Sequence, residues 1–413
     1  MKKICFIMIF LILLSVLSAQ EFDIDDIIKL GLENSYDINI QDYYLKNSKQ
    51  NLYSSYLDLL PTANYSISRT ENSANEVIQS GNIQISESIS SNDSRYFSIR
   101  SNHMSHEKEK LDYESTRRNI IFEIISSYIN LLEKKSNLEL AKQNVKTAKL
   151  DFERTKVLKE HGKVSKLDLQ QSKISLAQTQ LDSLKAYDQY VNSKIELCYQ
   201  VNINYSPNLD FKNIEYKFHD PVKNKYNPEN NLSLLSAKED LKLTKLNLFQ
   251  NNLEFLPTLS FSVNKSFEWE KTTPLTFEDD QPYSFTLQLS YPLLNSIINY
   301  PHNRVYRNNL KVQKLLLQET SKEIEKDYIF YKTSYKQAKM GLKLAQRQTE
   351  LTEMQYELIR QKYELGQSDI TDLEKARQDL FNSKYDKVGK YYDLIILQEN
   401  INLLTNVKLL QKY

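Results

Sequence analysis

A stretch that occurs twice decides the fold: "YLDLLPTANYSISR" at Tyr56–Arg69 and "NLEFLPTLSFSVNK" at Asn252–Lys265. In each copy a helix-like run stops at Leu-Pro-Thr, and alternating apolar and polar residues follow it. Proline excludes the helical conformation from the residue before it, so Pro61 and Pro257 are predicted strand-entry residues at which a helix gives way to a strand. A chain that makes this transition twice is expected to contain two copies of one structural unit.

Other residue pairs extend the match along the chain. Pro61 and Pro257 are 196 positions apart (257 − 61), whereas Gly162 and Gly366 are 204 apart (366 − 162). The difference of eight (204 − 196) falls where the second copy carries a charged segment, "EKTTPLTFEDDQP" (270–282). One insertion in a loop explains the change of register, and the sequence predicts an internal tandem duplication.

Each half has the same predicted order: short helix, helix, strand, loop, strand, very long helix, tip and long helix. An Asn- and Pro-rich stretch between the halves predicts a linker with little regular structure. The predicted divisions are a signal peptide at 1–19, a first repeat at 20–201, a linker at 202–231 and a second repeat at 232–413. The tips at which the long helices meet are expected at 162–168 and 366–372.

The N-terminus has the pattern of a secretory signal. Lys2 and Lys3 precede an apolar run, Ile4–Leu17, and Ser18-Ala19 supplies small residues for cleavage. We expect the segment to be removed; a retained anchor helix is the alternative. Cleavage would leave Cys198 as the single cysteine, so no intrachain disulfide is expected.

The amino-acid composition limits the kinds of partner and structure that this chain can be expected to have. Charged residues make up 26% of the chain with a net charge of +1, which gives no reason to expect a nucleic-acid partner. Six Gly and nine Pro are few for 413 residues, as expected of long uninterrupted helices. No later stretch has 18 uninterrupted apolar residues, so an exported chain of this kind could enter a membrane only as strands.

Four segments have the period of two that marks a strand with one apolar and one polar face. They are expected at about 63–70, 82–89, 258–269 and 283–291. In the last of these, Tyr283, Phe285, Leu287, Leu289 and Tyr291 alternate with polar residues. Terminal aromatics suit a transmembrane β-barrel, while a half-buried sheet in a soluble domain is the alternative.

The number of strands bears on that choice. Four strands cannot close a barrel, because about eight are needed even to fill one with side chains. An open sheet cannot sit in a bilayer, because its edges would be unpaired in hydrocarbon. Either the sheet is soluble or several chains pool their strands, and the direct passage from strand into very long helix favours pooling.

The long helices are expected to carry two apolar rows. A first row in the second repeat has spacings of three and four: Ala338, Leu342, Ala345, Thr349, Thr352, Tyr356, Ile359 and Tyr363. A second row repeats every seven residues: Leu344, Leu351, Leu358 and Leu365. The first repeat has Leu131, Leu138, Val145 and Phe152 at sevens, and its partner helix has Leu167, Ile174 and Leu181. Two rows on one helix predict neighbours on both sides, whereas one row would make a simple coiled coil.

These features together resemble the TolC-like outer-membrane efflux proteins. The residues that carry the resemblance are the signal sequence, the two "LPT" strand entries, "LSYPLL" (289–294, with the strand-entry Pro292) and the Gly-x5-Asp tips. The resemblance implies a mainly α chain with a small β part, which pools four strands per chain into a twelve-stranded barrel as a homotrimer. It also implies a long α-helical barrel that reaches from the outer membrane into the periplasm.

The resemblance further implies an exit duct of a tripartite efflux or type I secretion system. An inner-membrane pump would drive substrates through the tube, joined to it by a periplasmic adaptor (membrane-fusion) protein. The expected adaptor-docking tips contain Gly162, Ser165, Gly366 and Asp369. Locally, the two glycines are expected to end helices in a left-handed conformation, and Ser165 and Asp369 to cap the returning helices.

Three tip residues match positions of the family's periplasmic aperture. Asp372 matches a carboxylate that forms a ring across the pore, where three copies would attract cations. The family's second acid, three residues later, is Lys375 here. Tyr363 and Asp168 match a pair that links neighbouring helices in the closed state, and the Arg that often joins them is Ser368 in this chain.

No other functional class has comparable support. His103-x2-His106 with nearby glutamates could coordinate a metal, but a solvated helix face is the preferred interpretation. We find no phosphate cradle or nucleophile elbow in the sequence, and expect no enzyme activity, cofactor or metal. The alternative function is an exported periplasmic coiled-coil scaffold without channel activity.

Overall fold

The computed structural model describes residues 21–71, 77–90, 93–218, 228–270, 284–291 and 293–411. The expected signal peptide, Pro292 and most of the expected insertion lie outside these residues. The chain forms two compact units. Unit 1 comprises Met1–Ile38, Thr116–Pro228 and Ile324–Tyr413, and unit 2 comprises Asn39–Ser115 and Glu229–Glu323. Each unit takes segments from both predicted repeats.

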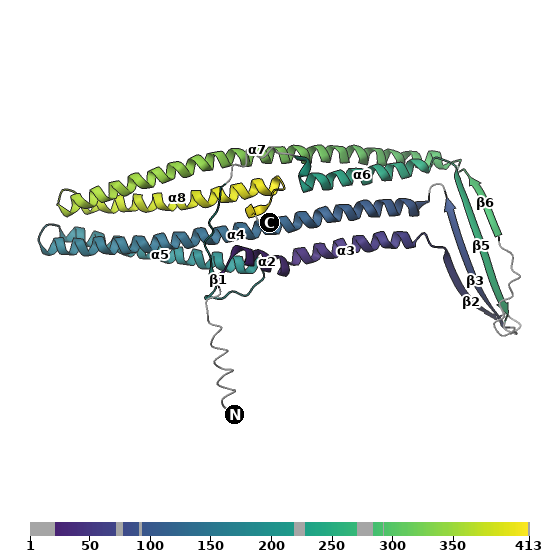
Figure 1. Cartoon of the computed structure of the whole chain (residues 1–413), viewed down its shortest axis with the longest axis horizontal. Coiled ribbons are helices and arrows are strands. Elements are labelled where there is room, and N and C mark those ends of the chain that lie inside the picture. The colour runs from purple at the N-terminus through teal and green to yellow at the C-terminus, as the bar shows by residue number, and fades with distance from the viewer. Residues whose placement is uncertain are drawn as a thin grey trace, which may run out of the picture. The chain divides into compact units, whose positions relative to one another are not determined.

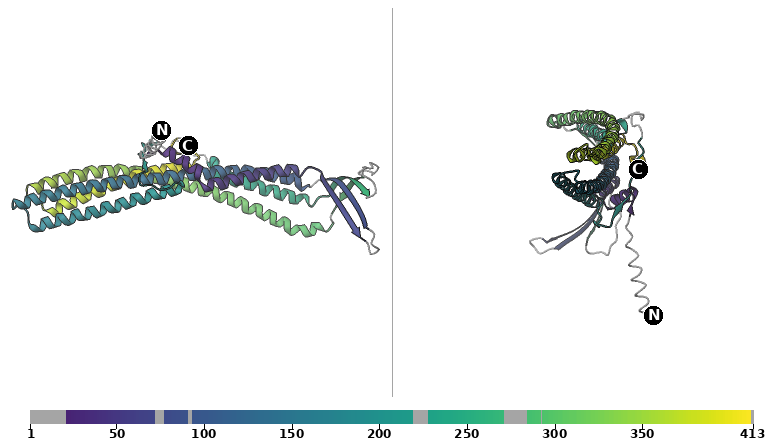
Figure 2. Two further views of the ribbon diagram at one scale, coloured as in Figure 1. Left: turned by 90° about the horizontal axis from the view of Figure 1, so that it is seen from below. Right: turned by 90° about the vertical axis from the view of Figure 1, so that its left-hand side faces the viewer.

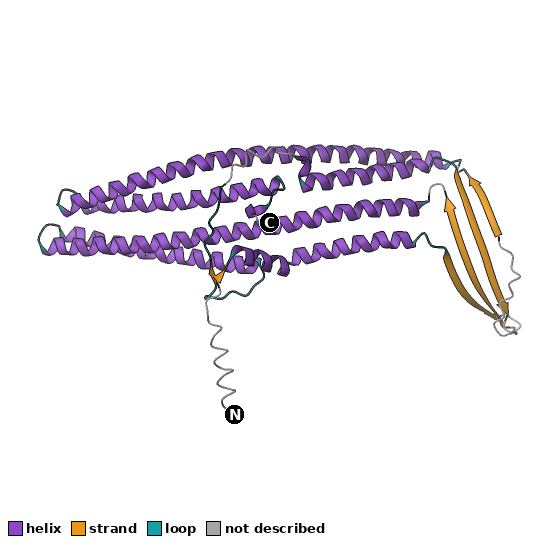
Figure 3. Ribbon diagram, in the orientation of Figure 1, coloured by secondary structure: helices purple, strands orange, loops and turns teal. Residues whose placement is uncertain are grey.

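The prediction of a mainly α chain with a small β part is confirmed (Figures 1 and 3). The first half contains α2 (Ile24–Asn34), α3 (Tyr36–Leu57), β2 (Thr62–Glu71), β3 (Val77–Ser90), α4 (Ser94–Glu160) and α5 (Lys166–Gln200). The second contains α6 (Leu232–Leu253), β5 (Thr258–Glu270), β6 (Ser284–Ser290), α7 (Asn295–Glu364) and α8 (Ile370–Leu404). In its described part, the second half has only a 3-10 turn, η1 (Pro228–Asn230), before α6, where a short helix was expected.

Unit 2 holds an antiparallel sheet in the order β2-β3-β5-β6 (Figure 3). Ile89 pairs with Phe261, and Phe261 pairs with Leu287, so the apolar residues of three strands share one face. These side chains are 59%, 43% and 73% exposed within the chain. In the described part of the chain, these side chains on the apolar face of the sheet are therefore left uncovered.

The two Leu-Pro-Thr segments end their helices in the same way. Leu60 N donates to Leu57 O at 2.9 Å, and Leu256 N donates to Leu253 O at 3.0 Å. Each strand then begins one residue after Pro61 or Pro257. The same local turn thus occurs at both strand entries, as expected from residues whose effect on the backbone is short-range.

Arg95 organises the return from strand to helix in the first repeat, a role that the sequence did not reveal. Its Nη1 lies 2.9 Å from Glu87 Oε1 on β3, and its Nη2 lies 2.6 Å from Asp93 Oδ2. Nη1 also donates to Asp58 O at 3.3 Å, just beyond the end of α3. One guanidinium therefore joins the strand entry and the strand exit.

The main core of unit 1 gathers apolar residues from α2, α4 and the end of α5. Its fully buried side chains include Ile27, Ile28, Ile124, Ile125, Leu131, Leu197 and Val201. The stretch expected as a linker joins this core: β4 (Asp210–Phe211) pairs with β1 (Glu21–Phe22), and Phe211 is buried. Tyr128 Oη donates to Lys212 O at 2.7 Å. The expected linker therefore has little regular structure, but its described part packs against the core of unit 1.

The two apolar rows of α7 have different environments. Ala345, Thr349, Tyr356 and Tyr363 of the first row are buried against other helices of unit 1. Leu344, Leu351, Leu358 and Leu365 of the second row are exposed, and so are Leu167, Ile174 and Leu181 on α5. Within the described residues, no helix combines the length and apolar character needed to cross a membrane.

Candidate functional site

The helix tips of unit 1 are two turns of nearly identical geometry. In the first, Gly162 has φ +73°, and Lys163 N donates to Leu158 O at 2.9 Å. In the second, Gly366 has φ +74°, and Gln367 N donates to Lys362 O at 2.8 Å. These are the bonds of a Schellman motif, in which a glycine in the left-handed conformation ends a helix. Both glycines are exposed.

The returning helices begin at the two expected capping residues. Ser165 and Asp168 form a capping box: Asp168 N donates to Ser165 Oγ at 3.1 Å, and Ser165 N donates to Asp168 Oδ2 at 2.7 Å. Asp369 accepts a bond from Asp372 N at 2.9 Å. The Asp372 carboxylate itself is exposed and accepts a bond from Ser368 Oγ at 3.0 Å. Asp168 and Asp372 both lie in a first helical turn, where the helix dipole favours negative charge.

Tyr363 lies inside the protein behind the second tip. Its side chain is 2% exposed, and its Oη is 3.0 Å from Thr155 Oγ1 on α4. Burial raises the pKa of Tyr363, and the negative charge of Asp168 acts in the same direction. The Tyr363 hydroxyl is thus paired with Thr155, and the Asp168 carboxylate with the backbone N of Ser165.

A buried polar cluster lies further from the tips and joins α4 to α7 and α8. Asp151 Oδ2 accepts a hydrogen bond from Tyr356 Oη at 3.2 Å, and Asp151 Oδ1 is 3.4 Å from Arg154 Nη1. Arg377 Nε lies 3.9 Å from Asp151 Oδ2. Burial raises the pKa of the Asp151 carboxyl, although the Arg377 charge acts in the opposite direction.

This cluster was missed in the sequence, although a signal was present. Arg377 lies between Leu373 and Leu380 at the spacing of a buried helix face, and Asp151 lies between Ala148 and Thr155 in the same way. A charged residue at such a position must find partners inside the protein. Which residues would supply them could not be read from either helix alone.

Glu374 links the returning helices of the two tips. Its Oε2 accepts a hydrogen bond from Gln171 Nε2 on α5 at 3.2 Å, and burial raises the pKa of its carboxyl. The neighbouring Lys375 is exposed. Glu374 thus faces α5, whereas Asp372, two residues earlier, lies at the surface.

His106 and the neighbouring glutamates of α4 have ordinary polar partners. His106 Nδ1 is 2.8 Å from Ser48 Oγ, and Glu109 accepts a bond from Gln41 at 3.0 Å. Glu107 pairs with Lys110 at 2.7 Å. In the part of the chain that the structure describes, no group of three potential ligands could hold a metal ion.

The fold of this chain is similar to the folds of several solved outer-membrane channels. The fold matches the outer membrane channel CmeC of Campylobacter jejuni (17% identity, TM-score 0.79), over 94% of this chain and 87% of that one. It matches VceC of Vibrio cholerae (12%, TM-score 0.83) over 94% and 96%, and MtrE of Neisseria gonorrhoeae (13%, TM-score 0.79) over 94% and 90%. No curated protein sequence matches. The fold is that of outer-membrane channels.

The sequence also matches a known protein family. Residues 32–199 match the model of the outer membrane efflux protein family. The match supports the resemblance to TolC-like proteins that the sequence predicts. The matched family is one of channels rather than enzymes.

Proposed function

We propose that three copies of this chain form one tube that accepts substrates from an inner-membrane pump through a periplasmic adaptor. Each chain contributes its four strands to a twelve-stranded barrel in contact with outer-membrane lipid. The observation that carries the proposal is the open four-stranded sheet, whose apolar face is uncovered. Such a sheet can enter a bilayer only if neighbouring copies pair with both of its edges.

The exposed heptad rows support the same assembly. On α7, Leu351 and Leu358 are 59% and 61% exposed, and on α5, Ile174 is 64% exposed. Rows with a period of seven match a neighbouring helix rather than solvent. A ring of chains would cover α5 of one copy and α7 of the next, which accounts for the two rows expected from the sequence.

Two measurements test the duct. Membrane fractionation should recover the protein with the outer membrane, and solubilisation should require detergent. The purified oligomer should then conduct ions across a planar bilayer. Recovery in the soluble periplasm without detergent would contradict the proposal and favour a coiled-coil scaffold.

We propose that the adaptor docks at the two tips. The support is that both glycines are exposed, and a Cβ added at Gly162 or Gly366 would meet nothing within 4 Å. A Gly366→Trp variant should reach the membrane as wild type does, yet export less substrate. Normal export by a variant that assembles normally would argue against docking at this tip.

We also propose that Asp372 lines the aperture, where Asp168 and Tyr363 contribute to the closed state. The Asp372 carboxylate is exposed in one chain and can therefore meet its copies across a threefold axis. Asp372→Ala should change conductance or cation selectivity while the oligomer stays intact. Unchanged permeation would remove Asp372 from the aperture.

A further inference from the structure

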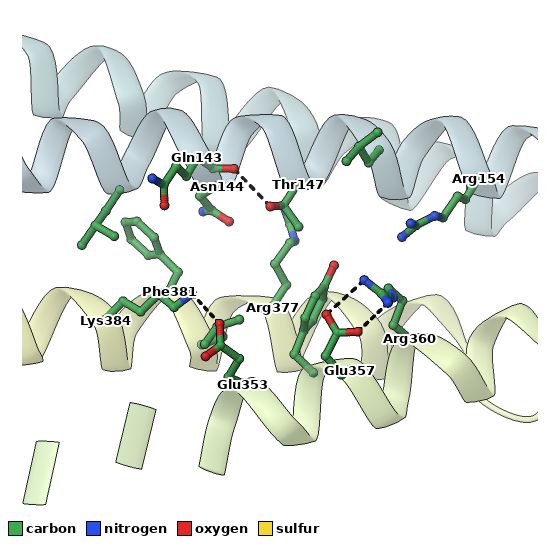
Figure 4. A pocket seen from close by; sticks show the side chains of 14 residues that line it. Gln143, Asn144, Thr147, Arg154, Glu353, Glu357, Arg360, Arg377, Phe381 and Lys384 are labelled. Carbon is green, nitrogen blue, oxygen red and sulfur yellow. Dashed lines mark hydrogen bonds and ion pairs between the residues drawn. The ribbon is translucent and has the colours of Figure 1, made fainter. Parts of the chain in front are cut away.

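Charged side chains of α7 that face the rest of the chain have partners within it. Where α4, α7 and α8 meet, Glu353 accepts a hydrogen bond from Lys384 Nζ at 2.9 Å, and Arg360 Nη1 donates to Glu357 Oε1 at 3.0 Å (Figure 4). Arg347, on the exposed side of the same helix, takes part in no ion pair or side-chain hydrogen bond among the described residues. This unpaired charge lies within an apolar surface.

That surface is a row of exposed side chains on α7 with alternating spacings of three and four residues. Arg347 is the single charged member of the row, which we call the α7 row. Such spacing is that of one side of a two-helix coiled coil. Its members are Met340, Leu344, Arg347, Leu351, Met354, Leu358, Gln361 and Leu365.

Helix α5 carries a row of the same kind, again with one charged residue. Asp188, the charged member, is exposed and has no ion pair or side-chain hydrogen bond among the described residues. We call this set the α5 row, and all its members are exposed except the half-buried Val191. They are Gln170, Ile174, Ala177, Leu181, Leu184, Asp188, Val191 and Ile195.

The two rows match when they run in opposite directions. From Arg347 toward the tip the successive steps are four, three, four, three and four residues, and from Asp188 toward the tip they are the same. Away from the tip both rows continue with steps of three and four. Because α7 runs toward its tip and α5 away from its own, copies that stand side by side bring these helices together antiparallel. With Arg347 opposite Asp188, the neighbouring layers are apolar, such as Leu351 with Leu184.

Contacts within unit 1 relate the levels of α7 and α5 along their length. The hydroxyl oxygens of Thr352 on α7 and Ser383 on α8 are 2.7 Å apart. Glu374 lies nine residues (383 − 374) nearer the tip on α8 and accepts a hydrogen bond from Gln171 of α5 at 3.2 Å. Gln361, nine residues beyond Thr352 on α7, is therefore level with Gln171.

On this scale Arg347 and Asp188 lie at nearly the same level. Arg347 is 14 residues (361 − 347) further from the tip than Gln361, and Asp188 is 17 residues (188 − 171) further than Gln171. The difference of three residues is about 4.5 Å along the helices. A long side chain on a helix points toward the N-terminus, so the Arg347 guanidinium extends away from the tip, in the direction of Asp188. A threefold rotation about an axis parallel to the helices leaves these levels unchanged.

Each charge also has a possible partner on its own helix, but neither of these pairs is formed among the described residues. Glu350 is three residues from Arg347, and Lys185, three residues from Asp188, lies instead 3.5 Å from Asp182. Exposed pairs of this kind contribute little to stability. A partner in an opposing row is attracted more strongly, because the apolar layers on both sides keep water away.

We propose that α7 of one copy pairs with α5 of the next in the register that sets Arg347 opposite Asp188, and that this ion pair fixes the register. The inference rests on the proposed ring of chains and names the residues that align it. A single polar position in an apolar heptad row specifies register at a cost in stability. A shift by one heptad would set both charges against apolar side chains, where an unpaired charge is costly.

Cysteine cross-linking tests the register in a Cys198→Ala background, which removes the buried native thiol. Chains with Arg347→Cys are produced together with differently tagged chains with Asp188→Cys, and the membranes are oxidised. A disulfide needs Cα atoms about 4.4–6.8 Å apart, whereas one heptad moves a residue by about 10 Å. We expect a covalent dimer of the two tagged chains, and none from either variant alone.

Leu181→Cys and Ile195→Cys, each one heptad from Asp188, are the matched controls. Both should cross-link to Arg347→Cys far less than Asp188→Cys does. A cross-link to either control in place of Asp188→Cys overturns the register. The absence of a cross-link in every combination overturns the pairing of these two helices.

Exchanging the charges tests the ion pair itself. Arg347→Asp or Asp188→Arg alone should make the detergent-solubilised oligomer dissociate about tenfold faster or more on heating, because like charges then meet. The double variant should regain most of the wild-type rate, and Lys339→Glu, an exposed change outside the row, should match wild type. A double variant that dissociates as fast as the single variants overturns the pair.

Failure of the register and failure of the duct give different results. A wild-type oligomer that conducts ions but shows neither the cross-link nor the rescue leaves the duct standing and overturns the Arg347–Asp188 pair. A wild-type chain that stays monomeric contradicts both.

Discussion

The two helix tips have the same turn but different surroundings. Gly162 and Gly366 have φ values of +73° and +74°, and each turn closes with the same pair of backbone bonds. Beyond the turn the likeness ends. Leu373 of α8 is 1% exposed, whereas its counterpart in α5, Leu169, is only partly buried. Figure 2 shows the two hairpins of unit 1, α4–α5 and α7–α8, extending to these tips.

The two repeats thus share the local geometry of the tips but not the burial of the helices beside them. The turns depend on neighbouring residues and are therefore copied faithfully. Burial depends on what lies beside the helix: α8 packs against α4 and α5, while the apolar row of α5 finds no cover within the described chain. Each tip thus leaves one apolar row without cover in the described chain, that of α5 at the first tip and that of α7 at the second.

The exposed rows provide the strongest test of this comparison. Ile174→Glu on α5 or Leu351→Glu on α7 would bury an unpaired charge between copies, which costs several kcal/mol. Either variant should lose the oligomer while its monomer keeps native helicity, as measured by light scattering and circular dichroism. Gln346→Glu, an exposed change on α7, is the control. An intact oligomer in both row variants would mean that the rows do not meet.

The buried leucine of α8 should matter more to one chain than its counterpart on α5. Leu373→Ala removes a fully buried side chain and should lower the free energy of unfolding by about 2–5 kcal/mol. Leu169, 204 residues earlier, is only partly buried, so Leu169→Ala should cost less. Denaturant unfolding of the two variants measures both. Equal losses would contradict the unequal burial of the tips.

The two glycines should instead behave alike. A Cβ at either position meets nothing within 4 Å, so substitution acts through the left-handed backbone alone. Gly162→Ala and Gly366→Ala should each cost about 1–2 kcal/mol, the penalty of that conformation for a residue with a Cβ. Hydrogen exchange at the ends of α4 and α7 reports the loss. A clear difference between the variants would show that the turns are not equivalent.

The N-caps should differ slightly. Ser165 shares a complete capping box with Asp168, whereas Asp369 only accepts from Asp372 N. Replacing either cap by Ala should cost about 0.5–2 kcal/mol. Ser165→Ala should cost more, because the reciprocal bond to Asp168 also loses its geometry. Hydrogen exchange in the first turns of α5 and α8 measures both, and a greater loss at Asp369 would contradict this ranking.

The smallest effect concerns pH. Burial raises the pKa of Asp151 above its ordinary value of 3.8, so the folded protein holds this proton more tightly than the unfolded chain. The corresponding stability is present below about pH 4 and is lost as the pH rises through the folded pKa. Asp151→Asn should flatten this part of the unfolding profile, while Glu153→Gln, an exposed change nearby, should not. Identical stability profiles for wild type and Asp151→Asn would contradict a contribution of Asp151 to the pH dependence.

Local features could be predicted from the sequence because they depend on a few neighbouring residues. Pro61 and Pro257 marked the strand entries, Gly162 and Gly366 the helix ends, and period-two alternation the four strands. The heptad rows likewise follow from spacing alone. The aperture role of Asp372 and the docking role of the tips remain proposals, since both depend on chains other than this one.

The sequence by itself determined the duplication, the order of the elements and the chemistry of the tips. Only the tertiary structure decided which apolar row is buried, that Arg95 joins the strand entry to the strand exit, and that Asp151 meets Tyr356 and Arg377. The physical reason is distance along the chain: Tyr356 and Asp151 are 205 residues apart. Local propensity carries no information about such pairs, because they exist only once helices from both repeats pack side by side.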